Sequence, residues 1–201
     1  MTKPRLETSI LRILAPVLRD DGFRGSGRTF RRTAGDTLLI LNVQGSRYGG
    51  QFAINLGVQP LSIPDVWGQT VDPRKITESQ CEFRRRLSDT GEDQWWTHDG
   101  SQEGMDDAVR QAVGVYATAG RKLLALMAAD DSPVRSLKPA DFAMFRAAFQ
   151  GFAGTECRTA LVLARVRLAR DDHDQAHGFA AIALTHASPG SALRKEIEKL
   201  L

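Results

Sequence analysis

The sequence predicts an α+β fold: an N-terminal helix, then an antiparallel meander sheet of four to five strands, then a C-terminal all-helical segment of four to five helices. Apolar residues recur at helical spacing near the N-terminus, alternate with period two between about residues 28 and 98, and return to helical spacing from about residue 103. The connections between the strand-like runs are too short for the crossovers of a parallel sheet. The order of these patterns therefore favours hairpins followed by helices.

Composition places the chain among ordinary globular proteins. Its 201 residues are 42% hydrophobic and 25% charged, and no run approaches the ~18 apolar residues of a membrane span. The two cysteines, Cys81 and Cys157, lie far apart and form no CxxC pair, which favours a reducing, cytoplasmic compartment. The net charge of +3 is too small by itself to favour nucleic acid as a partner.

The N-terminal helix is predicted over about residues 4–19, with Pro4 at its start. Pro16 lies late in this segment and is expected to kink or shorten the helix, because proline has no backbone N–H. The acidic and glycine residues at positions 20–22 form a stop signal.

The sheet is predicted from alternating apolar residues separated by turn residues. We expect strands over about residues 28–33, 37–46, 51–58, 80–88 and 94–98. Short turns at residues 34–36 and 48–50 favour antiparallel hairpins. Residues 59–79 contain three prolines and no clean period, so we expect an extended loop there.

Helices dominate the remainder of the chain. We expect them over about residues 103–128, 141–152, 155–170, 175–186 and 191–201, with Ser101 as the cap of the first. Two units are expected, an α+β domain over residues 1–130 and a C-terminal helical extension over residues 135–201.

Strand alternation separates a core face from a polar face. The residues expected on the core face of the second and third strands are Leu39, Leu41, Val43, Phe52, Ile54 and Leu56. Asn42, Gln44 and Asn55 then lie on the opposite face, here called the amide face. Arg84 and Arg86 join that face, which leaves Arg85 in an awkward position toward the core.

The amide face is the candidate binding surface. Its candidate residues are Asn42, Gln44, Asn55, Arg84 and Arg86, with Arg28 and Arg31 at the edge and Trp95 and Trp96 nearby. Amides and guanidiniums supply many donors and suit an anionic or polar partner. The alternative is a solvated sheet face, with the mid-strand asparagines explained by hydrogen bonds within the fold.

Signals for chemistry are weak. His173 and His177 are four residues apart beside aspartates, but no third ligand is evident, so we expect neither a metal site nor a cofactor. Cys157 near Glu156 and His186 could be drawn as a nucleophile with a base, but free cysteines are usually small buried hydrophobes, so we assign no catalytic residues.

Several segments in order resemble the DUF4304 family, an uncharacterised bacterial domain family. They are Asp21-Gly22-Phe23, Gly27-Arg28-Thr29-Phe30-Arg31-Arg32, Leu41-Asn42-Val43-Gln44-Gly45-Ser46, Phe52-Ala53-Ile54-Asn55-Leu56-Gly57, and Cys81-Glu82-Phe83-Arg84-Arg85-Arg86-Leu87 leading to Trp95-Trp96. The resemblance covers about residues 1–130. It implies a compact α+β domain of unknown role and supplies no catalytic residues to assign.

These observations favour a non-enzymatic domain that binds another protein through the amide face or the tryptophans, and an immunity or antitoxin-like role is one version of this. The first alternative is nucleic-acid binding through Arg24, Arg28, Arg31, Arg32, Arg47 and Arg84 to Arg86. The second is an enzyme acting on a small anionic metabolite, which would need a pocket beside the amide face. No membrane is expected as a partner.

Overall fold

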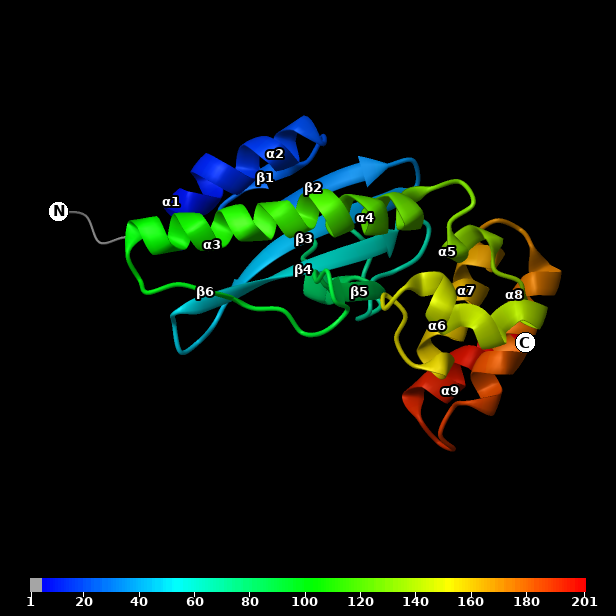
Figure 1. The fold of residues 1–201 in the computed structure, drawn as a ribbon. Helices are drawn as coiled ribbons and strands as arrows, with labels where there is room; N and C mark the ends of the chain where they lie inside the picture. Colours follow the sequence, from blue (N-terminus) through cyan, green and yellow to red (C-terminus); the bar gives the residue numbers. More distant parts are fainter. Residues whose placement is uncertain (1–4) are drawn as a thin grey trace.

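The computed structural model describes residues 5–201. Two helical segments lie against one face of a twisted sheet, and the C-terminal helices pack beside one end of that sheet (Figure 1). The predicted α+β class is confirmed. No helix within the described residues combines the length and the apolar composition needed to cross a bilayer.

The N-terminal helix is one continuous segment with a widened turn in its middle. It consists of α1 (Leu6–Ser9), a π-helical turn (Ile10–Leu14) and α2 (Ala15–Asp20). Pro16 follows the π-helical turn directly. We attribute the widened turn to this proline, since its missing N–H breaks the regular α-helical bonding without ending the helix. Pro4, predicted at the helix start, lies outside the described residues.

The sheet has six strands. They are β1 (Arg24–Ser26), β2 (Thr29–Ala34), β3 (Thr37–Gly45), β4 (Gln51–Pro60), β5 (Phe83–Arg86) and β6 (Trp96–Thr97). The order is β1-β2-β3-β4-β5, every pairing is antiparallel, and β6 pairs with β4 at the end of that strand not used by β5. β1 was not predicted, because a three-residue exposed strand with a glycine at its centre has no apolar alternation.

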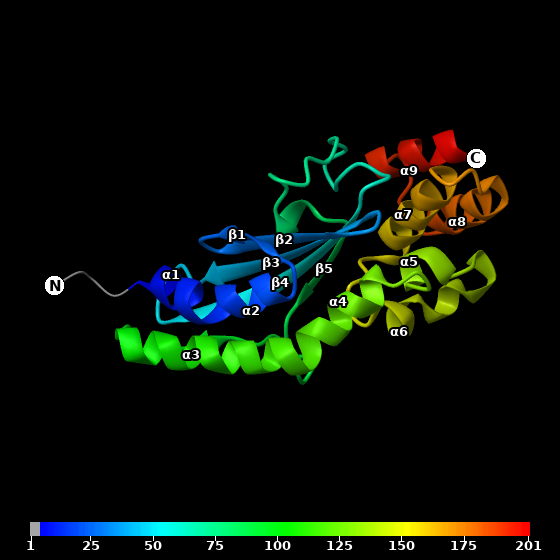
Figure 2. The ribbon, with the colours of Figure 1, turned by 90° about the horizontal axis from the view of Figure 1, so that it is seen from above.

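The first face of the sheet carries the main core. The six core residues predicted for this face are all buried, so the predicted register is confirmed. The N-terminal helix covers this face together with α3 (Gln102–Val115), a π-helical turn (Tyr116–Gly120) and α4 (Arg121–Ala128) (Figure 2). Ser101 caps α3, as predicted, by accepting a hydrogen bond from the Gly104 N–H.

The second face is only partly polar. Leu38 and Ile40 lie on it and form a separate apolar cluster with Ile76 and Cys81. Residues 61–82 cover this cluster from the side opposite the helices (Figure 2). This segment is more ordered than the predicted extended loop, and it contains the short 3₁₀ helix η2 (Glu78–Gln80) with a capping box at its start.

Gln59 organises the start of this covering segment. Its side chain is fully buried, and Nε2 donates to the carbonyl oxygens of Pro60, Ile63 and Pro64 at 2.9–3.2 Å. Its Oε1 accepts a hydrogen bond from the Glu82 N–H at 3.0 Å. One buried amide thus satisfies backbone groups at both ends of the covering segment, which would otherwise be costly to bury.

The C-terminal segment is helical, as predicted. It comprises α5 (Pro133–Ser136), a 3₁₀ helix (Pro139–Met144), α6 (Phe145–Phe149), α7 (Glu156–Leu168), α8 (His173–Thr185), α9 (Ala192–Ile197) and a final 3₁₀ turn (Glu198–Leu200). The helix predicted over residues 141–152 is shorter, since it begins as 3₁₀ and ends at Gln150, whose φ is +46°.

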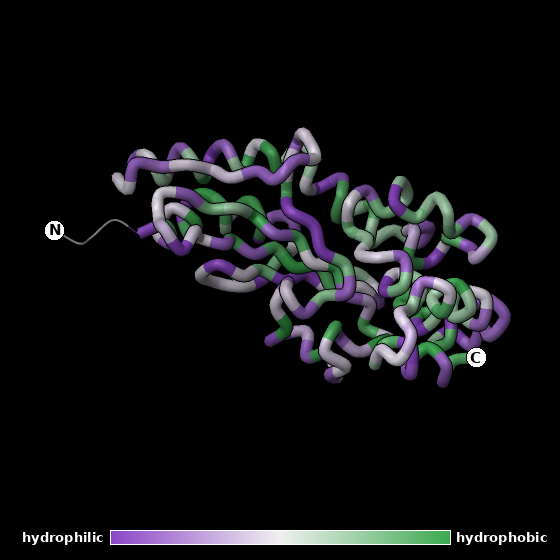
Figure 3. Tube along the Cα trace, turned by 90° about the horizontal axis from the view of Figure 1, so that it is seen from below, coloured by the Kyte–Doolittle hydropathy of each residue, from purple (hydrophilic) through white to green (hydrophobic). Residues whose placement is uncertain are grey.

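The C-terminal helices and the sheet share a single hydrophobic core. Buried side chains from Leu6 in α1 to Ile197 in α9 belong to one contiguous cluster. In Figure 3 the apolar stretches gather inside the sheet layer and inside the helical segment. The division into units at residues 1–130 and 135–201 stays a prediction, and the shared core favours joint folding of the two units.

Gly57 lets the covering segment lie directly on the sheet. A Cβ at this position would sit 2.9 Å from the Cys81 Sγ and 3.0 Å from the Glu78 Cα. We therefore expect Gly57→Ala to lower the free energy of unfolding by about 1–3 kcal/mol, because neither a buried thiol nor a helix backbone can move aside cheaply. Urea denaturation at neutral pH measures this change.

Gly114→Ala is the matched control. Gly114 lies inside α3, and a Cβ there would meet no atom within 4 Å. The same substitution should raise stability by about 0.5–1 kcal/mol, because alanine is the better helix former. Equal effects at the two glycines would contradict the close packing of η2 on β4.

Candidate binding groove

A row of polar residues crosses the open part of the second sheet face. Thr29, Asn42, Asn55 and Arg86 are direct neighbours on β2, β3, β4 and β5. Because adjacent positions in register share a face, all four side chains emerge on the same side. The Asn42 Nδ2 donates to the Thr29 Oγ1 at 2.9 Å. The amide face predicted from alternation is therefore present.

Gln44 connects Asn55 to Arg86. Its Oε1 accepts hydrogen bonds from the Asn55 Nδ2 at 2.8 Å and from the Arg86 Nη2 at 3.3 Å. Both mid-strand asparagines thus donate hydrogen bonds within the sheet. These bonds explain why asparagine, which is disfavoured in strands, occurs at both positions. Their carbonyl oxygens accept no hydrogen bond from residues 5–201 and are open to a partner.

Arg86 is held from three directions. Besides Gln44, it pairs with Asp93 at 3.1 Å and lies over the Trp95 ring at 4.7 Å. Trp95 is half-buried and donates from its indole N–H to Asp93 at 3.1 Å. Arg86 is therefore a fixed part of the surface, in which a cation rests on an aromatic face.

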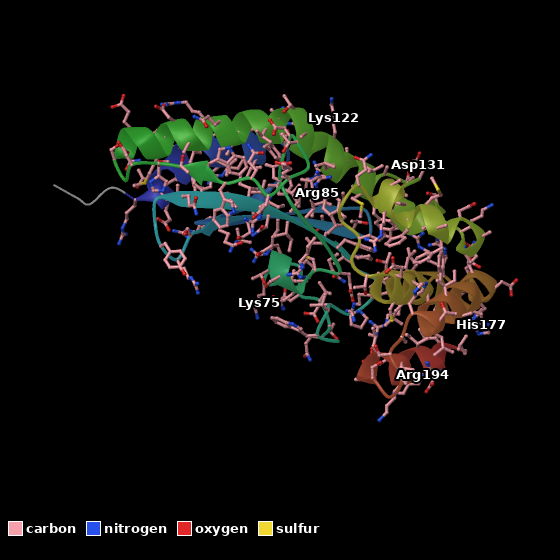
Figure 4. All side chains as sticks on the ribbon, turned by 60° about the horizontal axis from the view of Figure 1, so that its bottom comes forward. Lys75, Arg85, Lys122, Asp131, His177 and Arg194 are labelled. Atoms are coloured by element: carbon pink, nitrogen blue, oxygen red, sulfur yellow. The ribbon has the colours of Figure 1, made fainter. Side chains whose placement is uncertain are left out.

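Alternation along β5 sends its arginines to opposite sides. Arg84 is exposed on the amide side, and its guanidinium makes no hydrogen bond or ion pair with residues 5–201. Arg85 points to the helix side (Figure 4) and donates to the carbonyl oxygen of Gln150. Gln150 is the C-cap of α6, and a cation is favourable at the C-terminal end of a helix. This contact explains how Arg85 can point toward the core side of the sheet.

These residues line a groove of about 750 Å³, here called the β5 groove. Gln44, Asn55, Arg84 and Arg86 line its sheet side, and Glu78 and Ser79 of η2 line a second part. Residues 152–155 and Arg158 contribute a wall from the C-terminal segment. That wall is attached to the edge of the sheet, because the Arg84 N–H donates to the Phe152 carbonyl at 3.3 Å.

A buried ion pair fixes this wall. The Glu82 carboxylate is fully buried and accepts from the Arg158 Nε at 2.9 Å and from its Nη2 at 2.6 Å. Arg165 lies 3.8 Å away. Burial raises the pKa of Glu82, and the pairing with Arg158 opposes that rise. The two-pronged geometry is the strong form of an arginine–carboxylate contact.

Five of the predicted residues are not part of the groove lining: Arg28, Arg31, Asn42, Trp95 and Trp96. Arg28 points toward the N-terminal helix and pairs with Glu7 at 2.8 Å, so its expected place at the edge of the amide face is wrong. Trp96 is only 3% exposed and stacks on Phe52 in the core. Arg31 is on the second face, but its Nε donates to the Ile76 carbonyl at 2.7 Å, beneath the covering segment.

Sequence reasoning missed Glu82 and Arg158. They are 76 positions apart, and neither strand nor helix periodicity connects residues at that separation. The one local signal was a carboxylate next to buried Phe83, which requires a cation. Nearby, burial raises the pKa of the Cys81 thiol, which keeps it protonated and a poor nucleophile.

Histidines 173 and 177 do not converge with other ligands. Both are exposed on α8, and His177 lies on the outer side of that helix (Figure 4). No group of three or more His, Cys, Asp or Glu residues within residues 5–201 is placed to hold a metal ion.

The fold and the groove define an α+β protein with an arginine- and amide-lined surface at a sheet edge. The chain belongs to the DUF4304 family, described as a domain of unknown function, whose model matches residues 14–123. No curated protein matches the chain. No solved structure matches it either. The wall formed by residues 152–158 lies outside the family match, so the C-terminal segment adds to the family domain at this site.

Removing Arg158 should destabilise the protein strongly. Arg158→Met leaves a fully buried carboxylate whose nearest remaining cation is 3.8 Å away. We expect a loss of about 3 kcal/mol in the free energy of unfolding, measured by urea denaturation, because breaking a buried pair strands the other charge. Adding Glu82→Gln should recover part of the loss.

Arg110→Met is the control. Arg110 pairs with Asp107 on the exposed side of α3, and both side chains are more than half exposed. Its loss should cost less than about 0.5 kcal/mol. Equal effects of the two substitutions would show that Glu82 does not depend on Arg158.

Proposed function

We propose that this protein is a non-enzymatic binding protein whose β5 groove receives an acidic segment of a partner protein. The observation that carries the proposal is Arg84, an exposed guanidinium without an intramolecular partner in a groove where hydrogen bonds hold Gln44, Asn55 and Arg86 in place. Unpaired arginine among fixed neighbours suits a carboxylate, which it can bind with two parallel hydrogen bonds.

The surroundings of Arg84 support a peptide-like ligand. The groove offers the Asn55 side-chain carbonyl oxygen near Arg84, so it can bind a carboxylate at Arg84 and an N–H donor at Asn55. Half-buried Trp95 continues this surface in an adjoining hollow of about 420 Å³ that also contains Gln44 and Tyr48. Aromatic residues and arginine are the side chains that most often dominate protein interfaces.

A toxin-immunity or antitoxin-like role is the version of this proposal that we favour, because such proteins act through binding alone. We also infer a cytoplasmic location. Its support is that Cys81 and Cys157 are both free and buried, as in proteins of reducing compartments.

The enzyme alternative retains one supporting observation. A pocket does lie beside Asn55, and the carboxylate-bearing Glu78 is on its wall. The nucleic-acid alternative is weakened, because Arg28 is neutralised by Glu7 and the other arginines face separate hollows instead of forming one stripe.

Affinity capture from the native host tests the proposal. The wild-type protein should retain one partner in stoichiometric amount, and Arg84→Glu should lose it, because the substitution reverses the charge that meets the acidic segment. Arg19→Glu is the control, since Arg19 is exposed on α2, away from the groove. A partner retained equally by Arg84→Glu, or the absence of any stoichiometric partner, would refute the proposal.

A further inference from the structure

A second hollow lies at the opposite edge of the sheet. It has a volume of about 540 Å³ and is bounded by β1, β2 and residues 73–74 of the covering segment. Its lining consists of Gly22, Arg24, Gly25, Arg31, Arg32, Thr33, Leu38, Pro73 and Arg74. Four of these residues are arginines and none is acidic. We call this hollow the edge cleft.

Two of the arginines are placed against each other by the sheet itself. Arg24 on β1 is directly opposite Arg31 on β2, so both side chains emerge on the same face. Like charges in this position destabilise a strand pair. Two other arginines near the sheet have carboxylate partners, since Arg28 pairs with Glu7 and Arg86 with Asp93. Neither Arg24 nor Arg31 forms an ion pair within residues 5–201.

The other contacts of the cleft arginines are to neutral groups. Arg31 donates to the carbonyls of Ile76 at 2.7 Å and Lys75 at 3.1 Å, on the covering segment opposite the helices (Figure 4). Arg32 donates from Nη1 to the Asp21 carbonyl at 2.9 Å, and its Nε is buried without a partner. Two guanidiniums are thus oriented by backbone carbonyls and form no ion pair within residues 5–201, although Asp72 and Glu78 lie near Arg31 and Asp21 lies near Arg32.

The remaining two arginines are free to move onto a ligand. The side chains of Arg24 and Arg74 are exposed and make no hydrogen bond or ion pair with residues 5–201. Asp72 of the covering segment pairs with exposed Lys75 at 3.6 Å. The cleft therefore combines two arginines held by backbone carbonyls with two exposed arginines that have no partner within residues 5–201.

We propose that the edge cleft binds a small, multiply charged oxyanion of the phosphate class, such as a phosphate or pyrophosphate group of a soluble ligand. Guanidiniums match tetrahedral oxyanions in geometry and charge, and four of them favour a dianion or higher charge over a single carboxylate. The volume fits a small ligand, and a cleft confined to one sheet edge is a poorer fit for an extended nucleic-acid backbone. This site is separate from the β5 groove and does not depend on its function.

Isothermal titration with inorganic pyrophosphate, at low salt and neutral pH, tests the proposal. Binding should saturate at one pyrophosphate per chain. Arg24→Ala and Arg74→Ala should each weaken it at least tenfold, and both variants should fold normally because neither side chain has an intramolecular partner. A 20-nucleotide single strand, titrated in parallel, distinguishes a small anion site from a nucleic-acid surface.

Two controls make the outcome decisive. Arg110→Ala, on the far α3 surface, and Arg84→Glu, in the β5 groove, should leave the pyrophosphate affinity unchanged within twofold. The edge-cleft proposal is overturned if pyrophosphate shows no saturable binding, or if Arg24→Ala and Arg74→Ala bind it as tightly as the wild-type protein does. It is also overturned if the oligonucleotide binds preferentially and pyrophosphate cannot displace it. Arg84→Glu is expected to lose the protein partner and to keep its pyrophosphate affinity. The titration and the affinity capture therefore test the two proposals independently.

Discussion

The buried contact between Glu82 and Arg158 is the constraint on which the rest of the second sheet face depends. A carboxylate with no exposed surface needs a cation in direct contact, and among residues 5–201 its ion-pair partners both come from α7. The contact therefore fixes α7 against the start of β5. The Arg84 N–H bonded to Phe152 and the Arg85 guanidinium on Gln150 extend the same attachment along the strand. One wall of the β5 groove exists because of these contacts.

The two faces of the sheet differ in how they are covered. Its first face is covered by helices and is mostly apolar, which supplies most of the hydrophobic stabilisation. The second face is divided. Leu38 and Ile40 are covered by residues 61–82, which lie close only because β4 has a glycine at position 57. The part left open carries the amides and Arg86, and it is bordered by two arginine-containing hollows with separate linings.

Much of the fold could be predicted from local pattern, because period-two alternation determines which face each side chain occupies. It placed Asn42, Asn55, Arg84 and Arg86 together correctly. The same alternation places Arg28 with Phe30 and Arg32 on the helix-covered face, where it pairs with Glu7, so its predicted place at the edge of the amide face did not follow from the alternation. The ordered covering segment could have been expected from the unbroken apolar run at residues 38–41, which implies that both faces are buried. The groove wall could not, since the Glu82–Arg158 contact joins segments with no shared period.

Attachment of the C-terminal helices to the sheet is most directly tested by native-state hydrogen exchange. If the Glu82–Arg158 contact and the shared core make one cooperative unit, amides in the middle of α7 and of β4 should exchange through openings of equal free energy, that of global unfolding. Denaturant should accelerate both sets of amides to the same extent. Exchange in α7 through an opening several kcal/mol cheaper than that of β4 would contradict this, because the helices would then unfold independently and the groove would lack a fixed wall.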